Sequence, residues 1–133
     1  MEDYGKLILR IGLGIVFLYF GVSQLISPQR WIDLIPEVKF IYMNDIFKQK
    51  IILMNGVFDC LIGLCFILGI FIKLISLLAT LHLISIFIFS LGFTPSGFRD
   101  LGLALASLSL FFLGDGKFNL KKILNVKNKR ENN

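Results

Sequence analysis

The sequence is poor in the side chains that most often bind metals or attack substrates. It has one histidine and two cysteines in 133 residues. Haem ligation by two histidines and most metal sites built within this chain are therefore not expected. It also has no CxxC, GxGxxG, P-loop or HExxH motif. Redox-dithiol, dinucleotide, nucleoside-triphosphate and metalloprotease chemistry thus lack their usual sequence signatures.

Charged residues are scarce too, at 17% of the chain, whereas 56% is hydrophobic and the mean hydropathy is +0.78. The charges gather at the ends of long apolar runs, so the expected solvent of the middle of each run is lipid. The net charge is +5, but six of the fourteen basic residues fall within 117–130, beside an apolar segment. Attraction to a membrane surface explains this tail, and we expect a lipid bilayer and no nucleic acid as partner.

Four apolar runs predict an all-α fold, a four-transmembrane-helix bundle. A helix needs roughly 20 residues to cross the hydrocarbon core. The run after Phe93 is short, but Thr94 is a good N-cap and Pro95 a good first helical residue, and a start there gives a sufficient length. The predicted helices are 7–26, 51–72, 74–91 and 95–113, in one domain over 1–120, followed by a basic polar tail over 121–133 that is expected to be disordered.

The second and third runs are separated by little more than Lys73. Together they are too long for one crossing, so the sequence predicts a tight helical hairpin that turns near Phe71–Lys73. Four crossings place both termini and this turn on one side, with nine Lys and Arg residues against five on the other. The positive-inside rule therefore predicts cytoplasmic N- and C-termini in a multi-pass protein of the cell membrane.

The first run carries polar and small residues at helical spacing. Arg10, Gly14, Phe17, Gly21 and Gln24 repeat every three or four positions and form one stripe. Such a stripe is expected to face the other helices, which makes Arg10 and Gln24 structural polar residues. Alternatively, the Arg10 side chain reaches back to the headgroup region, since it lies only one turn into the membrane.

The predicted hairpin brings an acidic residue and the only histidine together. Asn55 and Asp59 share one face of the second helix, and a turn near residue 72 pairs Asp59 with positions close to His82 and Ser85. An intramembrane Asp–His pair can relay a proton or hold a polar ligand such as a quinone head group. It can also be a purely structural contact between helices.

Two further charged residues begin the fourth helix. Arg99 and Asp100 are expected at a depth similar to that of Asn55. They can complete a polar cluster there, or anchor the helix at the membrane interface.

Three stretches carry a resemblance to a known family. These stretches are Leu9–Phe17 with Gly21, Asp59–Gly63 with Gly69, and Arg99–Leu103 through Gly114–Gly116. On them the chain resembles, from about Lys6 to Leu120, the DoxX family of four-helix membrane proteins, which includes the DoxD-type subunit of thiosulfate:quinone oxidoreductase. It differs at Asp59, where the family usually has glutamate, and at Gln24, where a lysine is common.

The resemblance implies a membrane subunit of a redox system that passes electrons from a sulfur compound or thiol to quinone. Asp59 and His82 would then be the catalytic pair that handles the proton, and Arg99 would attract an anion at the outer face. The partner would be a redox subunit or another membrane protein. A non-catalytic scaffold or assembly partner is the alternative, so whether the chain is an enzyme stays open. The expected ligand-binding residues are Asn55, Ser85, Arg99 and Asp100.

Overall fold

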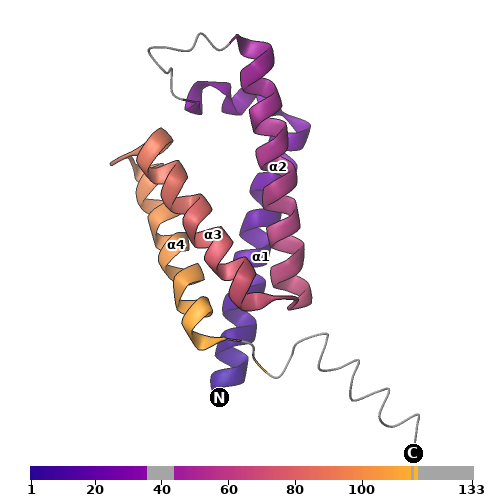
Figure 1. Cartoon of the computed structure of the whole chain (residues 1–133), viewed down its shortest axis with the longest axis vertical. Helices are drawn as coiled ribbons and strands as arrows, with labels where there is room; N and C mark the ends of the chain where they lie inside the picture. Colours follow the sequence, from indigo (N-terminus) through magenta and orange to yellow (C-terminus); the bar gives the residue numbers. More distant parts are fainter. Residues whose placement is uncertain (36–43, 115, 117–133) are drawn as a thin grey trace, which may run out of the picture.

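The protein is a bundle of four long antiparallel helices (Figure 1). A computed structural model describes residues 1–35, 44–114 and 116, and these contain no strand. A short 3-10 helix, η1, follows the first long helix, and a π-helical segment, η2, extends the third. The elements are α1 Glu2–Ile26, η1 Pro28–Leu34, α2 Asp45–Leu68, α3 Ile72–Ile86, η2 Phe87–Leu91 and α4 Pro95–Leu113.

All four helices are long and apolar enough to cross a bilayer. Counting η2 with α3, they have 25, 24, 20 and 19 residues and a mean hydropathy between 1.3 and 2.3. Large apolar side chains cover their outward faces, as at Ile8, Met54 and Phe112. Lipid accommodates such an exposed surface, whereas water does not. The predicted all-α bundle of four spanning helices is confirmed.

The fourth helix has the predicted bounds, and the other three differ. In α4 the Thr94 side chain accepts a hydrogen bond from the Gly97 N–H at 3.1 Å, and Pro95 is the first helical residue. α1 begins five residues before its apolar run. α2 begins six residues before its run, where Asn44 accepts from the Phe47 N–H at 2.9 Å. Hydropathy marks the hydrocarbon layer, but a helix continues through the polar interface until a cap ends it.

The hairpin turn lies slightly earlier than predicted. α2 ends at Leu68 because Gly69 adopts a left-handed conformation, with φ of 72°. Phe71 is also left-handed, and α3 starts at Ile72. The turn therefore spans Gly69–Phe71, and a glycine takes the position where a side chain would be strained.

Four glycines let the backbones of α1 and α2 approach closely. They are seven residues apart in each helix, and a Cβ atom at any of them would lie 2.6–3.0 Å from atoms of the facing helix. Because glycine has no side chain, the two helices pack closely along their length, as small residues allow in membranes. The four are Gly14, Gly21, Gly56 and Gly63.

The stripe predicted on the first helix is the buried face of α1. Its members Arg10, Gly14, Phe17, Gly21 and Gln24 are all buried. Arg10 is only 6% exposed, so its side chain lies within the bundle.

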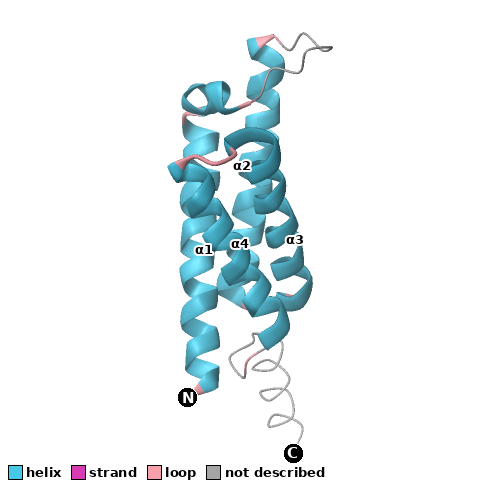
Figure 2. Cartoon of the chain, turned by 90° about the vertical axis from the view of Figure 1, so that its left-hand side faces the viewer, coloured by secondary structure: helices cyan, strands magenta, loops and turns pink. Residues whose placement is uncertain are grey.

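The helices form two pairs, α1 with α2 and α3 with α4, arranged as a V. The pairs meet at the end that holds the α2–α3 turn, called here the hairpin end, and lean apart toward the opposite, far end (Figure 1). A side view shows α4 and α3 in front, with α1 beside them (Figure 2). Apolar side chains from all four helices fill the space where the pairs meet, including Phe17, Phe66, Leu83 and Leu110. The predicted tail 121–133 lies outside the described residues.

Candidate functional site

A cavity of about 620 Å³ lies between the two helix pairs. Its wall is mostly apolar, with polar groups contributed by α1, α2, α3 and α4. Most of the predicted site residues line it: Asn55, Asp59, His82, Ser85, Arg99 and Asp100. Membrane-bundle sites are commonly built between facing helices in this way.

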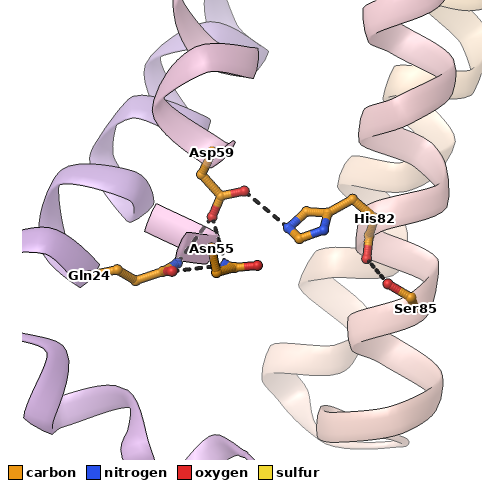
Figure 3. A network of polar contacts seen from close by, with 5 residues as sticks. All are labelled: Gln24, Asn55, Asp59, His82 and Ser85. Atoms are coloured by element: carbon orange, nitrogen blue, oxygen red, sulfur yellow. Dashed lines mark hydrogen bonds and ion pairs between the residues drawn. The ribbon is translucent and has the colours of Figure 1, made fainter. Parts of the chain in front are cut away.

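Asp59 is the centre of a buried polar network (Figure 3). Its Oδ2 atom accepts hydrogen bonds from Gln24 Nε2 at 3.0 Å and from Asn55 Nδ2 at 3.2 Å. Asn55 Nδ2 also donates to Gln24 Oε1 at 2.8 Å, which ties α1 to α2. The two amide groups therefore fix the Asp59 carboxylate from one side and leave Oδ1 directed across the gap toward α3.

His82 faces that second oxygen. Its Nε2 atom lies 3.1 Å from Asp59 Oδ1, so the sequence correctly placed the acid and the histidine side by side. The distance is that of an ion pair, but the buried Nε2 has no hydrogen bond of acceptable geometry among the described residues. The two groups are therefore neighbours without a well-directed hydrogen bond, because such a bond weakens steeply when bent. His82 Nε2 is thus close to a carboxylate and still able to bond to another group.

Ser85 is already engaged. Its hydroxyl donates to the His82 backbone oxygen at 2.6 Å, one turn back on α3. The oxygen still has lone pairs that can accept. The predicted role of Ser85 in ligand binding remains a prediction.

Arg99 and Asp100 lie in the same cavity without contacting the Asp59 network directly. Arg99 binds Asp100 Oδ1 through Nε and Nη2, both at 2.8 Å. Its guanidinium carbon also lies 4.6 Å from the centre of the Phe20 ring, a cation–π contact that connects α4 to α1. Asp100 is buried, whereas the Arg99 side chain is 45% exposed. The charge of Arg99 therefore stands at the rim of the cavity.

Sequence reasoning missed one donor of the cavity and gave a second one, Gln24, a structural role only. The Trp31 indole nitrogen is buried beside the cavity and has no hydrogen-bond partner in the described part of the chain. The sequence offered only the preference of tryptophan for interfaces as a signal. Gln24, predicted to be structural, belongs to the site through Asp59. Arg10, by contrast, does not line the cavity and instead lies against Gly69 at the hairpin end.

The polar side chains of the cavity are hydrogen-bonding groups. Within residues 1–35, 44–114 and 116, no three His, Cys, Asp or Glu side chains are placed to hold a metal. The available groups are the Trp31 N–H, the imidazole of His82 and the guanidinium of Arg99. They are hydrogen-bond donors, and a ligand with carbonyl oxygens complements them.

Fold and cavity together define a multi-pass integral membrane protein with a mostly apolar cavity that carries a few polar groups between two helix pairs. The DoxX family model matches residues 5–92, more than half of the 133-residue chain. The chain therefore belongs to the DoxX family, a family of four-helix membrane proteins. The match begins within α1, runs through η2 and includes Asp59 and His82, and it ends before Arg99. No curated protein and no solved structure matches the chain.

Proposed function

We propose that this protein is the membrane subunit of a redox system, in which the cavity binds quinone and a partner supplies electrons from a sulfur compound or thiol. The observation that supports this most directly is a cavity of about 620 Å³ with an apolar wall and a buried donor, Trp31 Nε1, that has no hydrogen-bond partner among the described residues. Ligand pockets typically enclose about 300–1,000 Å³ and combine apolar walls with a few placed polar groups.

The donors of the cavity fit the head group of a quinone. The carbonyl oxygens of a quinone are acceptors, and Trp31 Nε1 is a buried donor without a hydrogen bond among the described residues. His82 also lines the cavity, and its Nε2 lies 3.1 Å from Asp59 Oδ1. A buried donor that stays unpaired costs about 1–3 kcal/mol, so a ligand that accepts from it gains that interaction. When bound, a quinone supplies the capacity to take up two electrons and two protons.

Asp59 and His82 would then manage a proton at the ligand. Asp59 Oδ2 accepts hydrogen bonds from two amide groups, which hold the carboxyl group in one orientation. Its other oxygen lies 3.1 Å from His82 Nε2. We assign to His82 the transfer of the proton and to Asp59 the orientation and charge balance of the imidazole.

The orientation predicted from the basic residues completes the proposal. With the hairpin end in the cytoplasm of the cell, the rim with Arg99 faces the opposite side of the membrane. On that side the partly exposed guanidinium of Arg99 can bind an anion, such as an oxidised or reduced sulfur species. The redox partner would dock on that side.

A non-catalytic scaffold is the second candidate. It would use intramembrane polar groups to hold another membrane protein. The positions of the polar groups count against it, because the hydrogen bonds of Gln24, Asn55 and Asp59 connect these residues to one another. They face the cavity between the helix pairs and not the lipid.

The single tryptophan gives a direct test. Trp31 is the only tryptophan in the sequence and lines the cavity. The purified protein is titrated with decyl-p-benzoquinone, and the fluorescence of Trp31 is followed. Binding should quench this fluorescence, and the quenching should saturate at about one quinone per chain. His82→Leu should weaken binding, because it removes one donor to the ligand.

A tryptophan moved outside the cavity serves as a control, because quinone dissolved in the detergent micelle quenches any tryptophan at the protein surface. In the double variant Trp31→Phe, Phe112→Trp the tryptophan stands on the outside of α4, where Phe112 is 77% exposed. Its quenching should rise without saturation. Equal, unsaturable quenching of both reporters would refute quinone binding in the cavity.

A further inference from the structure

The floor of the cavity is closed by contacts between α2 and α3. Asp59 and His82 approach to 3.1 Å. The Phe58 ring meets the His82 ring edge to face, with 4.9 Å between their centres. From this level toward the hairpin end, packed apolar side chains fill the bundle.

The edge between α1 and α4 is also bridged. The Arg99 guanidinium lies over the Phe20 ring at 4.6 Å and connects the two helices. Arg99 is in turn fixed by Asp100 on its own helix. A molecule that enters along this edge would have to displace a cation from an aromatic face.

The far end is covered by η1. The Ser90 hydroxyl of η2 donates to the Leu34 backbone oxygen of η1. The Trp31 ring packs edge to face on Phe20, with 5.7 Å between ring centres. Both contacts hold η1 across the top of the cavity.

The remaining edge lies between α2 and α3, on the far-end side of Phe58. Ile51 of α2 and Phe89 of η2 line the cavity, and these residues are 37% and 71% exposed. Among the described residues, no hydrogen bond, ion pair or ring contact joins Ile51 to Phe89. The side chains at this edge are apolar, and both residues belong to helical spans that are expected to face lipid.

From these walls we propose that the slot between Ile51 and Phe89 is a lateral portal, through which the apolar tail of a bound quinone extends into the bilayer. The proposal rests on the quinone site described above and names its substrate class: lipid-dissolved quinones with a long tail, not small water-soluble quinones. The head group lies against Asp59, His82 and Trp31, and the tail passes between two helices that diverge from the hairpin end (Figure 1).

Photolabelling locates the tail. A p-benzoquinone whose decyl tail ends in a diazirine is bound to the purified protein and irradiated, and labelled peptides are mapped by mass spectrometry. Label that excess decyl-p-benzoquinone removes should fall on the surface around Ile51 and Phe89. Competable label concentrated near Val16 and Leu103, on the α1–α4 edge, would overturn the portal.

A matched pair of variants measures the tail contact. Phe89→Ala should weaken binding of decyl-p-benzoquinone about fivefold, the size of one aromatic packing contact, with less effect on tailless dimethoxy-p-benzoquinone. Phe112→Ala removes an equally exposed ring at the hairpin end of α4 and should change neither. Thermal unfolding of both variants checks that η2 and α4 remain folded.

The outcomes separate the portal from the quinone site itself. Saturable Trp31 quenching by both quinones, with equal effects of Phe89→Ala on the two, would reject the portal and keep the site. No saturable quenching by any quinone would reject the site, and with it the portal.

Discussion

The close packing of α1 on α2 should make Gly63 intolerant of even one added methyl group. A Cβ at Gly63 would lie 2.9 Å from the Gly14 backbone oxygen, 2.9 Å from the Leu18 nitrogen and 2.8 Å from Leu18 Cγ. Two of these three atoms belong to the backbone, so the helices themselves must move apart. Overpacking of this kind typically costs about 1–3 kcal/mol. We expect Gly63→Ala to destabilise the bundle by about 2 kcal/mol after the small gain in helix propensity is subtracted.

A second glycine supplies the control. Gly12 lies on the exposed face of α1, and a Cβ there would meet nothing within 4 Å. Gly12→Ala should leave stability unchanged or raise it by about 0.5–1 kcal/mol, because alanine favours the helix. Both variants are compared by unfolding in a mild detergent titrated with dodecyl sulfate, followed by circular dichroism.

Gly63→Ala should also disturb the cavity, because the contact between α1 and α2 sets the distance from Gln24 Nε2 to Asp59 Oδ2, which is 3.0 Å. Gly63→Ala should therefore also weaken quinone quenching of Trp31. If Gly63→Ala and Gly12→Ala unfold at the same dodecyl sulfate concentration, the close approach of α1 and α2 is refuted.

Three further predictions concern the network, a cap and the topology. Asp59→Leu should lower the free energy of unfolding by about 1–2 kcal/mol, because it leaves two amide donors without an acceptor. Asp59→Asn should lower it less. Equal unfolding curves in detergent for wild type and Asp59→Leu would contradict the buried network. Thr94→Ala should cost about 1 kcal/mol by removing the bond to the Gly97 N–H, and unchanged unfolding would argue against this cap. In a variant without native cysteines, Asp45→Cys should react with a membrane-impermeant maleimide added to intact cells, and Glu2→Cys only after permeabilisation; the reverse pattern would invert the proposed orientation.

The sequence was sufficient to predict the bundle because lipid leaves few alternatives. Long apolar runs must be helices, and Lys73 between two of them required a hairpin. The hairpin in turn predicted that Asp59 and His82 would be neighbours, since helical arms pair in register. That inference needed only one approximate turn position, and a shift of the turn to Gly69–Phe71 still leaves the pair in contact.

Other features of the site depend on how the pairs lean, which local pattern does not encode. Gln24 was expected on the buried stripe, but its bond to Asp59 follows from the glycine contacts that draw α1 onto α2. Trp31 reaches the cavity because η1 turns back over the bundle, held by the contact of Ser90 with Leu34. The cavity itself arises from the divergence of two helix pairs, and no spacing of apolar residues reports that angle.

The central claim, that the cavity holds quinone, is tested most directly by isolating the protein from its own membranes. The chain is purified in mild detergent, and every small molecule and protein that accompanies it is identified by mass spectrometry, alongside His82→Leu at equal expression. We predict about one long-tailed quinone per chain in the native protein and a marked loss in the variant. A protein free of quinone, or one that carries an unrelated membrane partner alone, would contradict the quinone site and favour the scaffold.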